Sequence, residues 1–367
     1  MKTALFDYHL PPEKIAQHPL EPRDNSKLLR VMNGGEFEEM IFRDITQLFR
    51  VGDVLVINDT KVMPARIRGI TYLESNKREK DKSSVLRFAP DTSFKKEAIK
   101  EVECLFLRNT APDIWEIMCF PGERLKTGRQ IILENNMVLE IVGETYAGRL
   151  VRVPVVHYEW LEVLQKYGEV PLPPYITEHL ANSELYQTVY AEHLGSTASP
   201  TAGRHFTPEL LQKIQNMWVT IAHVTLHIWP GTFKPIYEEN ITDYQIHSEY
   251  VTIPAETITL LENAKKEGRR IIAVGTTSMR SLESYSAGKF IILENDSYAG
   301  GTDIYITPGY EFQMVDVLIT NFHAPRTSLL VLVAAFMGYE QMMQAYQYAL
   351  DHQFRFLSFG DAMWVEK

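Results

Sequence analysis

The chain has 367 residues, of which 45% are hydrophobic and 23% charged, an ordinary globular composition that excludes global disorder. A net charge of −10 excludes a non-specific coat of nucleic acid, although a local basic patch could still bind RNA. The two cysteines, Cys104 and Cys119, are too few for a disulfide framework. We interpret them as core residues of a cytoplasmic protein, and no apolar run reaches the ~20 residues of a membrane-spanning helix.

The first part of the chain predicts mixed α/β structure. Residues 44–50 have apolar side chains at helical spacing, and residues 54–57 form an apolar run typical of a buried strand. The polar triplet Asn58-Asp59-Thr60 follows at once. Ligand contacts are common at this place in α/β folds, but a strand-terminating turn explains the triplet equally well.

Residues 65–155 have a different pattern, in which short alternating segments are separated by turn signals. The segments cover residues 102–107, 114–120, 130–133, 138–142 and 150–155. Short strands at this spacing predict a β-barrel or sandwich. The polar, highly charged stretch 74–84 predicts a solvated, mobile loop.

The α/β pattern returns after residue 155. Thr207-Pro208-Glu209 is typical of a helix start, and we expect this helix to reach residue 214. The further elements that we expect are a strand at 219–228, a helix at 256–267, a strand at 269–274, a helix from Thr276, a strand at 315–319, helices at 328–337 and 339–351, and closing strands at 355–358 and 362–365. The predicted fold is therefore α/β: a discontinuous α/β domain (1–64 and 156–367) with an inserted β-barrel domain (65–155).

Gly275-Thr276-Thr277 lies between a predicted strand and a predicted helix. Free amides and the positive end of a helix attract anions at such a turn, and Arg280, about one turn further, could add donors. An ordinary capped βα turn is the alternative. The small residues of 198–203, followed by Arg204 and His205, suit the binding of a flat heterocycle, with a plain Pro/Gly loop as the alternative.

His223 and His227 are four residues apart in a segment that favours a strand. On a strand they lie roughly 13 Å apart, so we reject a metal site built on this pair. The polar residues at 58–60, His227 with Gly231-Thr232, the turn at 275–277, and Asn321 with His323 all follow predicted strands. If these strands share one sheet, their ends converge on one crevice suited to acid–base catalysis on a polar substrate.

Motifs along nearly the whole chain carry a family resemblance. They include Phe6-Asp7-Tyr8, Asn58-Asp59-Thr60-Lys61-Val62, Pro200-Thr201-Ala202-Gly203, Thr225-Leu226-His227, Gly231-Thr232-Phe233, His247-Ser248-Glu249, Gly275-Thr276-Thr277, Thr320-Asn321-Phe322-His323 and Phe359-Gly360-Asp361. At these motifs the chain resembles the S-adenosylmethionine:tRNA ribosyltransferase-isomerases of queuosine biosynthesis.

The resemblance implies an α/β domain with an inserted β-barrel, and two partners, tRNA and S-adenosylmethionine. The implied reaction moves the ribosyl part of S-adenosylmethionine onto the aminomethyl group of a 7-deazaguanine wobble base, giving epoxyqueuosine, adenine and methionine. No metal is implied, and no cofactor beyond S-adenosylmethionine as a substrate. The sequence does not indicate an oligomeric state.

The site residues follow as hypotheses. Candidates for proton transfer are Asp59, His205, His227, His247 and His323. Candidates for substrate binding are Asn58, Thr60, Arg66, Thr201, Gly203, Gly231, Thr232, Gly275, Thr276, Thr277, Arg280 and Asn321. Candidates for RNA binding are the clustered cations Lys265, Lys266, Arg269 and Arg270.

Some positions depart from the family pattern. Ser199 and Arg204 replace an Ala and a Leu, Trp229-Pro230 stands where a Gly is usual, and Ala324-Pro325-Arg326-Thr327 replaces Leu-Pro-Lys-Ser. These departures leave two alternatives to the standard reaction: a diverged paralogue with another acceptor, and a non-catalytic tRNA-binding relative.

Overall fold

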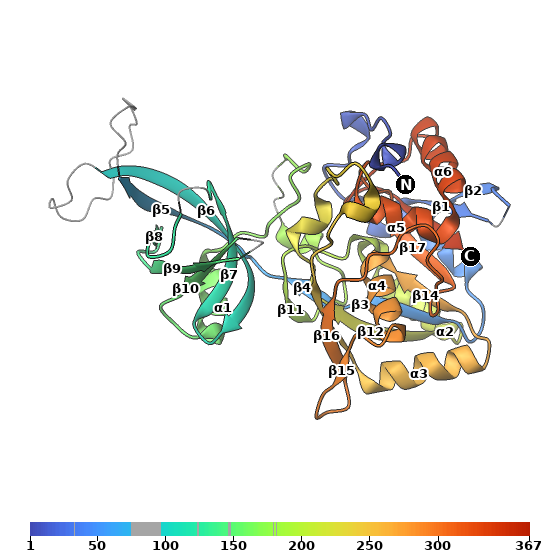
Figure 1. Cartoon of the computed structure of the whole chain (residues 1–367). Helices are drawn as coiled ribbons and strands as arrows, with labels where there is room; N and C mark the ends of the chain where they lie inside the picture. Colours follow the sequence, from blue (N-terminus) through green and yellow to red (C-terminus); the bar gives the residue numbers. More distant parts are fainter. Residues whose placement is uncertain (33, 75–96, 123–124, 146–147, 179, 181) are drawn as a thin grey trace. The chain divides into compact units, whose positions relative to one another are not determined.

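The computed structural model describes residues 1–32, 34–74, 97–122, 125–145, 148–178, 180 and 182–367, which form two compact units (Figure 1). Unit 1 comprises Met1–Val62 and Leu172–Lys367, and unit 2 comprises Met63–Pro171. Unit 1 is a mixed α/β structure and unit 2 a closed β-barrel, so the predicted fold class is confirmed. No helix of the described residues is long and apolar enough to cross a membrane.

A ten-stranded mixed sheet forms the centre of unit 1. Its strands, in spatial order, are β15 (Ile291–Ile292), β16 (Tyr298–Thr302), β13 (Glu249–Ile253), β12 (Thr220–Leu226), β3 (Val54–Asn58), β14 (Ile271–Val274), β17 (Val317–Asn321), β18 (Ala362–Glu366), β1 (Lys27–Val31) and β2 (Phe37–Ile41). The four neighbours β12, β3, β14 and β17 are mutually parallel. A separate parallel pair joins β4 (Thr60–Val62) to β11 (His193–Ser196).

Strand β3 separates two apolar cores because its side chains alternate between the faces of the sheet. Val54 and Val56 contribute to a core that also contains residues of α3 (Ala255–Lys266), α4 (Gly275–Ser286), α5 (Ser328–Met337) and α6 (Tyr339–Asp351). Leu55 and Ile57 face the other core, with residues of α2 (Pro208–Asn216) and the 3₁₀ helix η4 (Phe42–Leu48). A strand covered on both faces needs the continuous apolar run that the sequence has here.

The predicted helices of unit 1 occur close to the expected positions. The Thr207 hydroxyl accepts the Leu210 N–H at 3.1 Å and caps α2, as its sequence predicts. Gly338, with φ of 89°, ends α5 and begins α6, a backbone conformation that favours glycine. The remaining 3₁₀ helices are η1 (Thr3–Phe6), η2 (Pro12–Lys14), η3 (Arg23–Asn25), η5 (Ser183–Tyr186), η6 (Thr201–His205), η7 (Pro230–Phe233) and η8 (Ile241–Asp243).

One expected strand is wrong. Residues 355–358 form only an isolated bridge from Phe356 to Ile15, and the chain then turns at Leu357, where φ is 68°. The Asp361 carboxylate explains the turn, since it accepts the Arg355 N–H at 2.7 Å and the Lys27 N–H at 3.0 Å. The chain enters the sheet only at β18, after this turn is complete.

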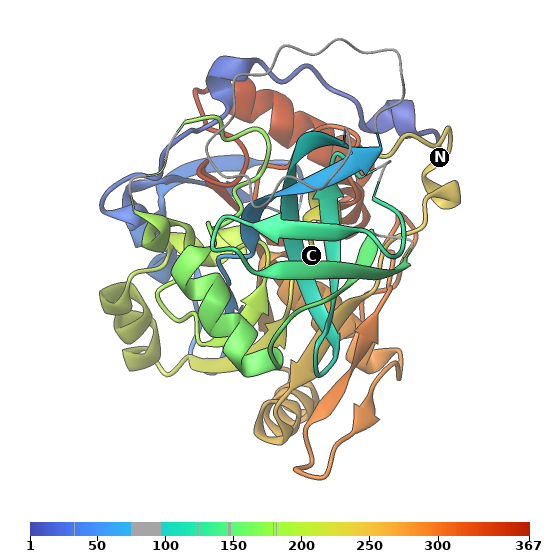
Figure 2. The same cartoon turned by 90° about the vertical axis from the view of Figure 1, so that its left-hand side faces the viewer.

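Unit 2 is a six-stranded closed barrel (Figure 2). Its strands, in spatial order, are β10 (Arg149–Arg152), β7 (Ile114–Phe120), β6 (Glu97–Ala111), β5 (Arg66–Glu74), β8 (Gln130–Leu133) and β9 (Val138–Glu144). Helix α1 (His157–Tyr167) belongs to this unit, because its Trp160 packs on Phe106 of β6 with ring centroids 5.2 Å apart. Cys104 of β6 and Cys119 of β7 lie opposite each other in the register of these two strands. Both are buried, as expected, and neither is in a disulfide. The stretch expected as a mobile loop lies outside the described residues apart from Glu74.

Candidate functional site

The ends of β12, β3, β14 and β17 lie at one edge of the sheet because the four strands are parallel and adjacent. A cleft opens here within unit 1. It is lined by residues 199–202, 275–277, 320–324 and 357–358, together with Tyr175, Ile228, Thr232, Thr327 and Leu329. Polar residues that follow β14 and β17 line this cleft, together with Thr232, whereas Asn58, Asp59, Thr60 and His227 are not among the residues that line it. A crevice at this place is where open α/β sheets bind ligands.

The N-terminus of α4 forms one wall of the cleft, with Gly275, Thr276 and Thr277. Gly275 has φ of 85°, which lets β14 turn directly into the helix. Asn58 fixes this wall to the sheet, because its Nδ2 donates to the Thr277 hydroxyl at 3.2 Å and to Leu226 O at 3.0 Å. Asn58 is fully buried and is therefore a positioning residue, whereas the first amides of α4 are suited to an anion.

The end of β17 also contributes to the cleft, with Asn321 and His323. The His323 Nε2 lies 2.8 Å from the Thr320 hydroxyl, and the backbone N–H of His323 donates to the Tyr346 hydroxyl at 2.9 Å. Burial lowers the pKa of His323 to about 3. The imidazole is therefore neutral at physiological pH, and it contributes no charge that would repel a cationic ligand.

Two buried polar atoms in the cleft wall have no hydrogen-bond partner among the described residues: the Ser199 hydroxyl and the Asn321 Oδ1. Ser199 is 3% exposed and Asn321 2% exposed. An unpaired buried polar group costs free energy that a bound ligand can recover. These two atoms are therefore available to polar groups of a ligand.

A buried ion pair lies beside the cleft. Arg280 is 4% exposed and donates from Nη1 to the Glu249 carboxylate, which is 1% exposed. The Glu249 Oε1 also accepts the Trp229 N–H and the Thr232 hydroxyl, each at 3.1 Å. Burial alone raises the pKa of Glu249, but Arg280 and the other donors outweigh it and lower that pKa to about 2.

The guanidinium of Arg280, which the sequence predicts to bind an anion, is engaged in this pair, so direct anion binding by Arg280 stays a prediction. Its positive charge is already matched by Glu249, and it lies outside the cleft wall. Its contact instead fixes Glu249, which in turn holds Thr232. His247 belongs to the same cluster, since its ring stacks on Trp229 with centroids 5.9 Å apart and its Nε2 is 3.5 Å from Glu249.

Gly231 and Gly203 approach side chains of the protein. A Cβ at Gly231 would lie 3.0 Å from the His247 ring, and one at Gly203 would lie 1.9 Å from the Tyr190 hydroxyl. A side chain at Gly203 would therefore displace Tyr190, and one at Gly231 would be in tight contact with His247. Thr201 and Thr232 line the cleft.

His205 is a buried packing residue rather than a member of the cleft wall. Its Nδ1 lies 2.7 Å from the Ser26 hydroxyl, its Nε2 lies 3.2 Å from Asn321 Nδ2, and its ring stacks on Phe42. Burial, followed by the charge of Arg204, lowers its pKa to about 3. Both ring nitrogens of His205 are engaged and it does not line the cleft, so its role in proton transfer stays a prediction.

Asp59, Thr60 and His227 form a second group outside the cleft. The His227 Nδ1 lies 2.8 Å from the Thr60 hydroxyl, and burial lowers the pKa of His227 to about 4. Asp59 contacts His193 and His223, which the sequence did not single out as its partners.

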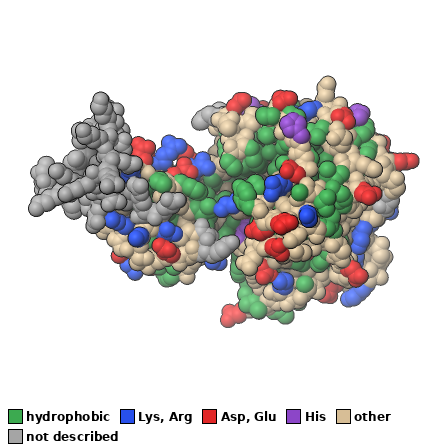
Figure 3. Space-filling view, turned by 45° about the horizontal axis from the view of Figure 1, so that its top comes forward, with side chains coloured by type: hydrophobic (Ala, Val, Ile, Leu, Met, Phe, Trp, Pro, Cys, Tyr) green, Lys and Arg blue, Asp and Glu red, His purple; other side chains and the backbone are tan. Residues whose placement is uncertain are grey.

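Arg66 and the basic quartet are not among the residues that line the cleft. Arg66 is in the barrel unit, where its Nε is 3.2 Å from Glu103. The quartet occupies the last turn of α3 and the segment that leads into β14, at the edge of the sheet opposite the cleft. Three of its members are paired: Lys265 with Asp316, Arg269 with Glu267, and Arg270 with Asp53. RNA binding by the quartet therefore stays a prediction. The face of the molecule drawn in Figure 3 has acidic and basic side chains interspersed.

Sequence reasoning missed Glu249 and Tyr175 as parts of this site. Glu249 stands in the quoted triplet His247-Ser248-Glu249, so the motif contained the signal although the acid was not selected. Tyr175 lines the cleft and lies 2.7 Å from Ser358 through its hydroxyl. This contact joins segments 183 residues apart, which no local pattern reveals.

Comparison with known proteins finds matches that extend over nearly the whole chain. A family described as "Queuosine biosynthesis protein" matches residues 3–365. An S-adenosylmethionine:tRNA ribosyltransferase-isomerase of Desulfitobacterium hafniense is 44% identical, and one of Caldanaerobacter subterraneus subsp. tengcongensis is 42% identical, each over the full length of both chains. The crystal structure of S-adenosylmethionine tRNA ribosyltransferase from Thermotoga maritima is 31% identical, with a TM-score of 0.52 over 98% of this chain and 99% of that chain.

Proposed function

The chain belongs to the queuosine biosynthesis protein family, and from this membership we infer that it is an S-adenosylmethionine:tRNA ribosyltransferase-isomerase. It transfers the ribosyl part of S-adenosylmethionine to tRNA and isomerises it, which forms epoxyqueuosine and releases adenine and methionine. The cleft at the ends of β14 and β17 supports this activity best. It combines the free N-terminus of a twelve-residue helix with two unpaired buried polar atoms.

S-adenosylmethionine has three groups that the cleft can distinguish. Its methionine carboxylate suits the amides at the start of α4, where Thr276 and Thr277 add hydroxyls. Its ribose hydroxyls or adenine amine suit the unpaired Ser199 and Asn321 atoms, which need one acceptor or donor each. Its sulfonium requires a wall without competing cations, and His323 meets this condition because its imidazole is neutral.

The reaction needs a base and an acid at defined atoms. The sulfonium acidifies the neighbouring ribose carbon, so a base must remove a proton there, and the departing adenine benefits from a proton donor. His323 is the histidine of the cleft wall among the described residues, and we assign it the base role. The hydroxyl of Thr320, 2.8 Å from its Nε2, holds the ring in place.

One assay tests the activity. Purified protein, S-adenosylmethionine and tRNA with the aminomethyl deazaguanine base are mixed, and the tRNA nucleosides and free adenine are measured by mass spectrometry. Equal amounts of epoxyqueuosine and adenine are expected. With tRNA that lacks the modified base, the enzyme should release no adenine from S-adenosylmethionine. If adenine release does not depend on that base, or if no epoxyqueuosine forms, the proposed function is wrong.

A second assay tests the role of His323. In heavy water the wild type should exchange the ribose protons beside the sulfonium of bound S-adenosylmethionine, and His323→Ala should not. Calorimetric binding of S-adenosylmethionine controls for loss of the cleft. If His323→Ala binds S-adenosylmethionine and exchanges these protons at the wild-type rate, the base is another group.

A further inference from the structure

A second pocket of unit 1 has three arginines in its lining: Arg23, Arg204 and Arg355. They come from separate parts of the chain, because Arg23 belongs to η3, Arg204 to η6, and Arg355 precedes the turn that leads into β18. Ser358 lines both the cleft and this pocket, so the two adjoin at that turn. We call the second one the arginine pocket.

Arg204 is a buried cation whose partners in the protein are neutral. It is 4% exposed, and it forms no ion pair with a carboxylate of the described residues. Its Nε and Nη2 donate to Leu185 O at 3.0 and 2.7 Å, and its Nη1 donates to Ser358 O at 2.7 Å. A guanidinium has five N–H groups, so two of them are left for a ligand.

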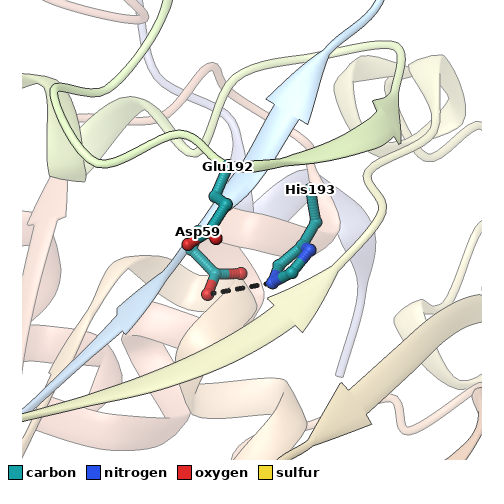
Figure 4. Close-up of side chains that lie close together, drawn as sticks. All are labelled: Asp59, Glu192 and His193. Atoms are coloured by element: carbon teal, nitrogen blue, oxygen red, sulfur yellow. Dashed lines mark ion pairs between the residues drawn. The ribbon is translucent and has the colours of Figure 1, made fainter.

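Two other buried charges of unit 1 lie next to a group that can carry the opposite charge. The Glu249 carboxylate is paired with Arg280. The Asp59 Oδ2 lies 3.8 Å from His193 Nε2, an approach that Figure 4 shows. A buried charge without such a partner is costly. Arg204 therefore differs from these two, and an anion from outside the chain would lower that cost.

Arg23 and Arg355 add to the positive charge around Arg204. The acids that act on them are Asp361, 3.2 Å from Arg355 Nη2, and Glu21, whose charge acts on Arg23 without forming an ion pair with it. Three positive charges thus face two negative ones, and neither acid belongs to the lining of the pocket. Burial and, to a lesser extent, the charge of Arg23 lower the pKa of Arg204 to about 9, so its guanidinium is still charged at pH 7.

We propose that the arginine pocket binds a phosphate group of the tRNA backbone, beside the nucleotide whose base reacts in the cleft; this subsite rests on the proposed function. Guanidinium groups present their N–H donors in a planar fork that matches the oxygens of a phosphate. The pocket and the cleft share Ser358, so a nucleotide with its base at the cleft has a phosphate near the pocket. Phosphate contacts of this kind fix the position of an RNA without reading its sequence.

The test is the affinity for tRNA and its dependence on salt, measured by fluorescence anisotropy at a series of NaCl concentrations. Arg204→Met removes the charge and keeps an unbranched side chain beside the Phe359 ring. Its Kd for tRNA should rise about 10- to 100-fold, the value of a charge-assisted hydrogen bond. The slope of log Kd against log salt should fall by about 0.7–0.9, as expected for one lost phosphate contact. Arg23→Gln should act in the same direction, and it serves as the second variant if Arg204→Met does not fold.

Arg30→Met is the matched control. It also removes one positive charge from unit 1, but Arg30 is paired with Glu38 and Glu366 and does not line the pocket. Its Kd for tRNA and its salt dependence should equal those of the wild type. Circular dichroism, thermal melts and the Kd for S-adenosylmethionine check that the fold and the cleft of each variant are intact.

Three results would overturn the proposal. One is a folded Arg204→Met or Arg23→Gln protein with the wild-type Kd and salt slope for tRNA. Another is an equal loss in Arg30→Met, which would assign the effect to net charge. The third is found by calorimetry with inorganic phosphate: if Arg204→Met loses a phosphate site but keeps its affinity for tRNA, the pocket serves a free anion.

These failures differ from a failure of the proposed function. If the wild type forms epoxyqueuosine while the arginine variants bind tRNA normally, the function stands and the phosphate site is wrong. A wild type that binds no tRNA would overturn both.

Discussion

The buried pair of Glu249 and Arg280 gives the prediction that follows most directly from the geometry. In Arg280→Met the Glu249 carboxylate loses its cation but keeps the Trp229 N–H and the Thr232 hydroxyl. Removing one partner of a buried ion pair typically costs about 3–5 kcal/mol, because a charge remains unpaired. For a unit of this size that loss corresponds to a fall in Tm of about 6–20 °C.

The pH dependence of this loss has a defined sign. In the wild type the pKa of Glu249 is lowered to about 2, so its contribution to stability is present above the ordinary carboxyl pKa and is lost as pH falls toward 2. Without Arg280, burial dominates and raises that pKa. Protonation then relieves the unpaired charge, so the stability difference between variant and wild type should shrink as pH falls from 7 to 4.

Thermal melts of wild type, Arg280→Met, Glu249→Gln and the double variant at pH 7 and pH 4 measure these effects. The double variant should be more stable than Arg280→Met, since replacing both partners leaves no buried charge. An Arg280→Met protein as stable as the wild type, or one whose deficit grows on acidification, would refute the reasoning.

Three further predictions follow from the same structure. Ser199→Ala should weaken S-adenosylmethionine binding by about 2- to 10-fold in calorimetry, the value of one neutral hydrogen bond, and unchanged affinity would remove Ser199 from the site. His205→Gln should flatten the fall in the free energy of unfolding between pH 6.5 and 4. The lowered pKa of His205 costs the wild type up to about 1.4 kcal/mol for each pH unit of acidification, and the variant lacks this cost. Parallel plots of unfolding free energy against pH for the two proteins would contradict this. Lys265→Glu combined with Lys266→Glu should leave the Kd for tRNA and its salt dependence unchanged, since Lys265 is paired with Asp316. A weaker complex whose affinity depends less on salt would show that these lysines bind tRNA.

The sequence predicted the parts of the fold whose signals are local. Thr207 before Pro208, the glycine at 338 and the apolar run at 54–57 each specify a boundary or a buried strand, and all three occur as expected. The convergence of strand ends also followed, because parallel neighbours must end at one edge. Strand β5 was missed, since only its pairing with β6 and β8 identifies it as part of the barrel.

The roles of single site residues depended on contacts that no pattern contains. His205 and His323 both follow apparent ligand motifs, yet one is held between Ser26 and Asn321 while the other lines the cleft. Arg280 looked like a free cation until Glu249, 31 residues away, proved to be its partner. Burial and long-range pairing decide these cases.

Two departures from the family pattern are accommodated by packing. The Arg204 guanidinium donates to Leu185 O and Ser358 O and lies 4.3 Å from the centre of the Phe359 ring. Trp229 stacks on His247 and donates its N–H to Glu249. Neither side chain lines the cleft, so neither alters the surface that we assign to S-adenosylmethionine.

The most direct test of the account is to block the cleft and measure S-adenosylmethionine binding. Ala324 lines the cleft, and Ala287 is an exposed residue after α4 that does not, so Ala324→Phe and Ala287→Phe form a matched pair. Calorimetry should show that Ala324→Phe loses S-adenosylmethionine binding at an unchanged Tm, while Ala287→Phe binds like the wild type. A wild-type Kd in Ala324→Phe would contradict the central claim, because the substrate would then bind elsewhere.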